Sequence, residues 1–118
     1  VHFPVDDWVL DAKARHWLDI LVEYLTQAPD VEQFYIDGHT DSTHTTTYNI
    51  ELSRKRAESV QTYLIENGVS PNLISIRFHG ERFPVGSNKS VAGRAENRRV
   101  TMRVELALQA QGKALARR

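Results

Sequence analysis

Apolar residues recur at helical spacing in two stretches of the chain. The first stretch predicts an amphipathic helix from Leu10 to about Ala28, ended by Pro29, because proline lacks the N–H group that a helix interior needs. The apolar face of this helix is formed by Leu10, Ala14, Trp17, Leu18, Leu21, Val22 and Leu25. The second helix is predicted from Ile50 to Glu66, with Asn49 as its N-cap and Asn67-Gly68 as its C-terminal stop.

Short runs of alternating or β-prone residues surround these helices. The segments predicted to form strands are 1–5, 34–36 (closing at Gly38-His39), 73–78 and 100–108, whereas 40–48 and 80–97 are predicted to be loops. Because crossovers between parallel strands are right-handed, this order favours helices on one face of the sheet. The predicted fold is α+β: a two-layer βαβαββ sandwich with a mixed, partly parallel sheet.

Length and composition narrow the class of protein. The chain has 118 residues, which suits one domain, predicted at 1–108, followed by a basic, flexible tail at 109–118. Hydrophobic residues make up 41% of the chain, but no apolar run approaches the roughly 20 residues of a membrane-spanning helix. The absence of cysteine excludes disulfides, thiolate zinc sites and cysteine nucleophiles.

The net charge of zero hides an asymmetry between the two halves. Residues 1–51 carry ten acidic and two basic side chains, and residues 52–118 carry five acidic and thirteen basic ones, a net of −8 against +8. We expect the opposite charges to meet in space, because a sheet-and-helix domain interleaves its halves. Nucleic-acid binding by the arginines of 94–103 is not expected, since no aromatic stacking platform accompanies them.

Three polar residues fall inside the apolar stripe of the second helix. At about 100° per residue, Asn49, Ser53 and Arg56 share the face of Leu52, Ala57, Val60, Tyr63 and Leu64. A buried cation needs a partner, and Asp41 follows the preceding strand, in a loop that opens with Thr40 where parallel-strand folds bind ligands. We predict an open ligand pocket, in which Arg56→Ala keeps near-native stability. The alternative is a structural Asp41–Arg56 salt bridge, which would make the same change cost several kcal/mol.

Several separated motifs resemble those of a known family. They are Ile36-Asp37-Gly38-His39-Thr40-Asp41, Asn49-x-x-Leu52-Ser53-x-x-Arg56-Ala57, Gly80-Glu81, Pro84, Asn88, Gly93-Arg94-Ala95 and Asn97-Arg98-Arg99-Val100. Together they resemble the OmpA C-terminal-like family of peptidoglycan-binding domains over residues 3–106. The resemblance implies a βαβαββ sandwich and the tethering of envelope proteins to the Gram-negative cell wall. Three features, Trp8, the run 77–82 and Asp37-Gly38-His39, are most similar to flagellar-motor members of the family.

The resemblance also implies roles for individual residues. Asp41 matches the position that takes the ammonium of meso-diaminopimelate, and Arg56 matches the position that takes its carboxylate. Asn49 and Arg98 match further peptide-contacting positions, and Thr40 completes the candidate site. The pairing suits the chemistry, because a carboxylate beside a planar guanidinium is the mirror image of a zwitterion.

The chain departs from the family at two places near this site. Phe3 is followed by Pro4, where the family often has aspartate, and Asp6 and Asp7 come later. Residues 42–44 read Ser-Thr-His where many members carry a glycine. The sequence pattern does not predict how the segment after Pro4, or residues 42–44, runs beside the candidate site.

The expected function is non-covalent peptidoglycan binding through the diaminopimelate of the stem peptide, in the periplasm, at the cell wall or outer membrane. The domain would anchor an envelope or flagellar-motor protein, so the expected partners are the stem peptide and motor or outer-membrane proteins. The alternative is an OmpA-like module for protein–protein interaction without peptidoglycan affinity. No catalysis, metal or cofactor is expected, because His39, Asp41 and His44 lack a ligand spacing and Ser53 lies within a helix.

Overall fold

The described part of the chain contains three α-helices, one 3₁₀ turn and three strands. The computed structural model describes residues 1–27 and 30–107. Its elements are α1 (Ala12–Gln27), β1 (Val31–Gly38), α2 (Thr46–Glu66), η1 (Pro71–Leu73), β2 (Ile74–Phe78), α3 (Val91–Asn97) and β3 (Val100–Leu106). The predicted tail at 109–118 lies outside the described residues.

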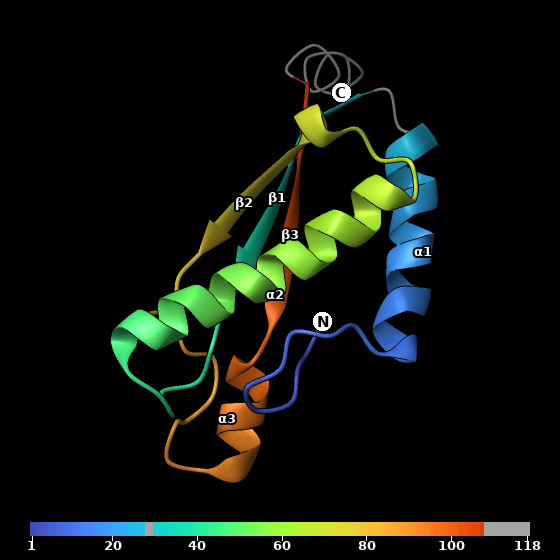
Figure 1. The fold of residues 1–118 in the computed structure, drawn as a ribbon. Helices are drawn as coiled ribbons and strands as arrows, with labels where there is room; N and C mark the ends of the chain where they lie inside the picture. The colour runs from blue at the N-terminus through green and yellow to red at the C-terminus, as the bar shows by residue number, and fades with distance from the viewer. Residues whose placement is uncertain (28–29, 108–118) are drawn as a thin grey trace, which may run out of the picture.

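The strands form one mixed sheet in the order β2-β1-β3. β1 runs parallel to β2, with Phe34 opposite Ile74, and antiparallel to β3, with Gly38 opposite Val100. α2 lies across one face of this sheet, and α1 stands beside the C-terminal half of α2 (Figure 1). The predicted α+β architecture with a partly parallel sheet is confirmed.

The core lies between the sheet and α2. Phe34 and Ile36 of β1 are buried because alternate residues of a strand face the same side. The inward stripe of α2 matches the predicted one, polar positions included, except that Tyr63 is only partly buried. The buried members are Asn49, Leu52, Ser53, Arg56, Ala57, Val60 and Leu64. Gly38 allows the close approach of helix and sheet, since a Cβ there would lie 2.0 Å from the carbonyl oxygen of Ser53.

α1 begins at Ala12 instead of the predicted Leu10, so Leu10 precedes the helix, and its buried face differs in part from the prediction. Ala14, Leu18 and Leu25 are buried as expected. The prediction that Trp17 faces the core was wrong: its side chain is exposed to solvent on the outer side of the helix. Trp17 falls at the edge of the apolar stripe, where spacing alone does not separate a core contact from an outward one.

The start of α2 also differs from the prediction. Thr45, not Asn49, is the N-cap, and its side chain accepts a hydrogen bond from the backbone N–H of Tyr48. The run of threonines therefore caps the helix and forms its first turn, where a hydroxyl satisfies a free N–H group. The predicted stop is confirmed, with Asn67 as C-cap and Gly68 at a φ of 107°.

Two further segments depart from the prediction. The predicted loop 80–97 contains α3, whose N-cap Ser90 accepts a hydrogen bond from the N–H of Gly93. The predicted first strand is reduced to an isolated bridge between His2 and Arg99. The chain leaves the sheet there because Pro4 has no N–H to donate and Asp6 adopts a left-handed φ of 59°.

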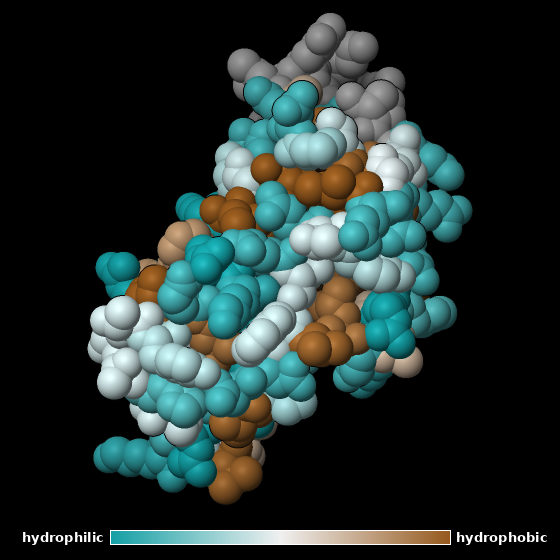
Figure 2. Space-filling view, in the orientation of Figure 1, coloured by the Kyte–Doolittle hydropathy of each residue, from teal (hydrophilic) through white to brown (hydrophobic). Residues whose placement is uncertain are grey.

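The acidic and basic halves of the chain meet as expected. Asp37 accepts from Arg77 Nε at 3.0 Å, and Asp41 accepts from Arg98 Nη1 at 3.2 Å. Figure 2 shows a largely hydrophilic band along the outer side of α2. Within residues 1–27 and 30–107, none of the helices has the length and apolar character needed to cross a membrane.

We expect Gly38→Ala to destabilise the domain by about 3 kcal/mol, because the new methyl group would collide with the backbone of α2. Gly68→Ala is the control: its Cβ would meet only Thr26 Cγ2 at 4.0 Å, so only the positive φ is penalised, by about 1 kcal/mol. Urea denaturation of both variants measures the difference. Equal losses would contradict the close helix–sheet contact.

Candidate functional site

The loop after β1 lies where the parallel strands β1 and β2 both end. The backbone N–H of His39 donates to the carbonyl of Arg99, and that of Thr40 donates to the carbonyl of Gly80. These two bonds hold the loop between the start of β3 and the segment after β2. The next residue, Asp41, is only 4% exposed.

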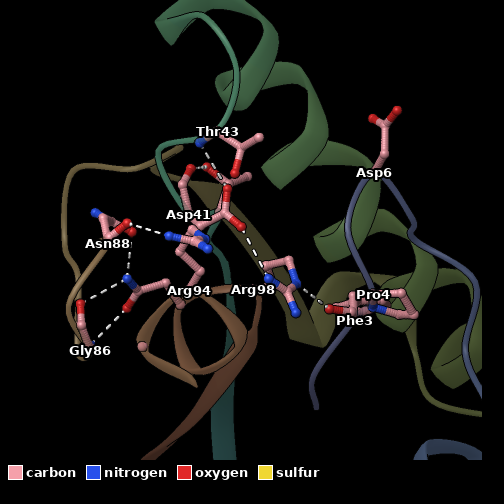
Figure 3. Close-up of polar contacts among 12 residues, drawn as sticks. Phe3, Pro4, Asp6, Asp41, Thr43, Gly86, Asn88, Arg94 and Arg98 are labelled. Carbon is pink, nitrogen blue, oxygen red and sulfur yellow. Dashed lines mark hydrogen bonds and ion pairs between the residues drawn. The ribbon is translucent and has the colours of Figure 1, made fainter. Parts of the chain in front are cut away.

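Asp41 is held by one backbone and one charged donor (Figure 3). Its Oδ1 accepts from the backbone N–H of Thr43 at 2.9 Å, and its Oδ2 accepts from Arg98 Nη1 at 3.2 Å. Burial by itself raises the pKa of Asp41, but the hydrogen bonds from Thr43 and Arg98 outweigh it and leave the pKa below its ordinary value. Arg98 in turn donates from Nε to the carbonyl of Phe3 at 2.8 Å.

Arg56 is completely buried and bonded to backbone. Its Nε, Nη1 and Nη2 donate to the carbonyls of Asp7, His39 and Pro4 at 2.9, 3.1 and 3.1 Å. Burial lowers the pKa of Arg56 to about 10, with the charge of Asp41 acting in the opposite direction, so the side chain stays cationic at neutral pH. Both sequence-based hypotheses for this pair need correction: Asp41 pairs with Arg98 instead of Arg56, and solvent does not reach the guanidinium.

Residues 4–8, which we call the N-terminal strap, close the site over Arg56. Besides the two carbonyls bound by Arg56, the carbonyl of Trp8 accepts from Ser59 Oγ at 2.6 Å. The ammonium of Lys55 lies 4.4 Å from the centre of a Trp8 ring. The strap is therefore fastened along one side of α2.

Asp6 fastens the strap to the start of α2. Its carboxylate accepts a hydrogen bond from the Tyr48 hydroxyl and lies 3.8 Å from His44 Nε2. The carboxylate points away from the Asp41–Arg98 pair (Figure 3). The path of the chain after Pro4, which the sequence left open, is therefore settled: Asp6 and Asp7 belong to the N-terminal strap that covers the site.

Asn49 is the candidate residue with an unused group. Its Nδ2 donates to the carbonyl of His44 at 3.1 Å and to Glu81 Oε1 at 3.0 Å, whereas its buried Oδ1 accepts no bond from the described residues. The two acceptors around Nδ2 define the amide orientation. Glu81 thus orients Asn49, a role that the sequence analysis missed although Gly80-Glu81 stood among the family motifs.

The other predicted polar residues serve the fold. Ser53 donates to the carbonyl of Ile50 at 2.7 Å and accepts from the N–H of Gly80 at 3.0 Å, so it links α2 to the segment after β2. The Thr40 hydroxyl donates to the carbonyl of Asp41 at 2.8 Å. Of the predicted set, the structure brings Asp41, Arg98 and Arg56 into one cluster of charges, with Thr40 beside it.

The rejected metal ligands do not come together. His39 stacks on His79, with ring centres 5.0 Å apart, and burial lowers its pKa to about 4, so it is neutral. His44 lies instead beside Asp6. Among the side chains that the structure describes, there is no group of three His, Cys, Asp or Glu residues able to hold a metal ion.

The sequence of this chain is similar to those of known outer-membrane and flagellar proteins. The outer membrane protein A of Bordetella avium is 39% identical over 102 residues, 86% of this chain and 52% of that protein. The sodium-type flagellar protein MotY of Vibrio parahaemolyticus is 30% identical over 86% of this chain and 35% of its own length. The chain therefore spans about half, or less, of these relatives.

A solved structure agrees along nearly its whole length. The peptidoglycan-associated lipoprotein of Burkholderia pseudomallei superposes with a TM-score of 0.85 at 30% identity, covering 89% of this chain and 88% of that one. The sequence profile of the OmpA family matches residues 2–98. The chain, with its mixed sheet and its charged cluster beyond the parallel strands, belongs to the OmpA family.

Proposed function

We propose that this domain binds peptidoglycan non-covalently through the diaminopimelate of the stem peptide, and so anchors an envelope or flagellar-motor protein to the cell wall. The observation that carries the proposal is the cluster of one buried carboxylate, Asp41, with two guanidiniums, Arg98 and Arg56. Its charges mirror the ammonium and carboxylate of a zwitterion. The similarity to a peptidoglycan-associated lipoprotein supports the same ligand.

The ligand ammonium takes the place of Arg98 at Asp41 Oδ2. Asp41 is oriented to receive it, because the hydrogen bond from Thr43 holds Oδ1, and only the Arg98 guanidinium has to be displaced from Oδ2. Arg98 is the more accessible cation, with 14% of its side chain exposed, and it makes the first contact with the ligand carboxylate. Charge-assisted bonds of this kind contribute about 1.5–3 kcal/mol each.

Arg56 takes part once the strap yields. Its carboxylate-binding role requires the carbonyls of Pro4 and Asp7 to be exchanged for carboxylate oxygens, since the guanidinium is otherwise fully covered. Asn49 is also fully buried, so its unused Oδ1 accepts an N–H of the peptide only when the cover over the site opens. The domain acts by binding without turnover, in the periplasm at the cell wall or outer membrane, and Ser53, bonded on both sides, is no nucleophile.

Calorimetry against muropeptides tests the proposal. We expect a diaminopimelate stem peptide to bind at least tenfold more tightly than one with lysine, which lacks the distal carboxylate, a difference of about 1.4 kcal/mol or more. Purified sacculi should retain the protein at low salt. If all of it stays in the supernatant, the domain is instead the alternative, a protein-interaction module.

Two variants separate ligand contact from structural support. Asp41→Asn keeps an acceptor for Thr43 but loses the charge, so we expect stability to fall by about 1 kcal/mol and affinity for the muropeptide by at least tenfold. Arg56→Ala strands three buried carbonyls, so we expect a loss of about 3–5 kcal/mol in stability. Thermal denaturation, followed by calorimetry well below the melting temperature, measures both. An Arg56→Ala protein of native stability would contradict the closed geometry.

The pH dependence of binding follows from Asp41. Its pKa in the folded protein lies below the ordinary 3.8, so the carboxylate stays charged at neutral and mildly acidic pH and is lost only as pH falls through that lower value. We therefore expect muropeptide affinity to change less than twofold between pH 7 and 5. A marked change in this range, measured by calorimetry, would contradict the assignment of the ammonium contact to Asp41.

A further inference from the structure

α1 carries a second apolar stripe that faces solvent. Trp17, Ile20 and Tyr24 are 58%, 51% and 48% exposed. They follow one another at a spacing of three and four residues, which places them along one side of the helix, opposite the buried Leu18 and Leu25. Three large side chains in one row are more than the scattered exposed residues that need no explanation.

The charges beside this stripe run against the helix dipole. On this side of α1 the N-terminal half carries Lys13 and His16 and the C-terminal half carries Glu23, whereas Asp19 is turned toward α2, where its carboxylate accepts a hydrogen bond from the Tyr63 hydroxyl. A helix is stabilised by acidic groups at its start and basic groups at its end, and α1 has neither in its first or last turn. The arrangement fits a neighbour that runs in the opposite direction and presents the same sequence.

We infer that α1 is a self-association surface, on which a second copy of this chain docks its own α1 in antiparallel orientation. This inference stands apart from the proposed function, because it uses none of the site residues. Antiparallel pairing brings the basic half of each helix to the acidic half of the other and aligns their dipoles favourably. A two-fold axis between the two copies makes the two basic–acidic contacts identical.

The positions around the helix are consistent with such an axis at Ile20. At about 100° per residue, Ile20 lies on the centre line, Trp17 and Tyr24 on one flank, and His16 and Glu23 on the other. A two-fold axis perpendicular to the helices brings like flanks together. Ile20 then meets its own copy, Trp17 meets Tyr24 of the second copy, and His16 meets Glu23.

The pairing leaves the charged cluster free. α1 lies beside the C-terminal half of α2, whereas the loop after β1 and the start of α2 lie at the far end of the molecule (Figure 1). A dimer through α1 would carry two such clusters, and two linked sites raise the avidity for a repetitive ligand without a new contact. A single helix pair is smaller than the roughly 1,600 Å² of a standard interface, so we expect a dissociation constant on the order of 100 µM.

Sedimentation equilibrium of the full chain, from about 10 µM to 1 mM, tests the inference. We expect a reversible monomer–dimer equilibrium. Ile20→Glu would place two carboxylates against each other on the axis and weaken association at least tenfold. Its exposed position leaves the fold intact, which circular dichroism checks. A chain that stays monomeric at 1 mM overturns the inference.

A charge exchange distinguishes this antiparallel pair from any other self-association. His16→Glu and Glu23→Lys should each weaken the dimer by roughly fivefold, since each loses or reverses both symmetric contacts. The double variant should regain the wild-type affinity. An equal mixture of the two single variants should also associate, because each heterodimer pairs the introduced glutamate with the introduced lysine and keeps one His16–Glu23 contact.

Glu66→Lys is the matched control, since it makes the same charge change at an exposed position on α2. We expect it to leave the dissociation constant unchanged. If the mixture of single variants remains monomeric, or if Glu66→Lys weakens the dimer as much as Glu23→Lys, the pairing through α1 is wrong.

Discussion

A guanidinium without access to solvent has to find its acceptors inside the fold, and Arg56 finds them in backbone carbonyls. Pro4, Asp7 and His39 supply them from segments that are far apart in the sequence. Leaving this cation unpaired would cost several kcal/mol, so the strap cannot lift away without a substitute acceptor. One side chain on α2 thereby holds the N-terminal strap, the end of β1 and the helix in register.

The Asp41–Arg98 pair depends on this arrangement. Arg98 is placed by the carbonyl of Phe3, and Phe3 directly precedes the strap that Arg56 holds. In the free protein the charges of the cluster satisfy one another or the backbone, which keeps the closed site stable. Under the proposed function, a ligand has to offer the same pattern of charges to compete with these internal bonds, and this requirement favours selectivity over tight binding.

Periodicity predicted the inward face of α2 well, including its polar members. Asn49, Ser53 and Arg56 are all buried, as their place in the apolar stripe implied. The partner of Arg56 was not predictable in this way, because backbone carbonyls are present at every residue and leave no mark in a sequence pattern. Thr45 could have been found from N-cap chemistry, but a run of threonines before a helix resembles a loop. Glu81 was visible only as a family motif, since its bond to Asn49 crosses 32 positions.

The amino-acid sequence by itself determined the two long helices, α1 and α2, the three strands of the mixed sheet and the motifs of the OmpA family, because these follow from local spacing and from order along the chain. The tertiary structure decided which charges pair, how the strap closes over Arg56, and that Trp17 faces outward beside Ile20 and Tyr24. Each of these depends on distances between segments remote in sequence, or on which side of a helix its neighbours leave uncovered. The periodicity of a single segment contains no information on these distances or on which helix side stays uncovered, because burial and pairing arise only when all the segments are packed together.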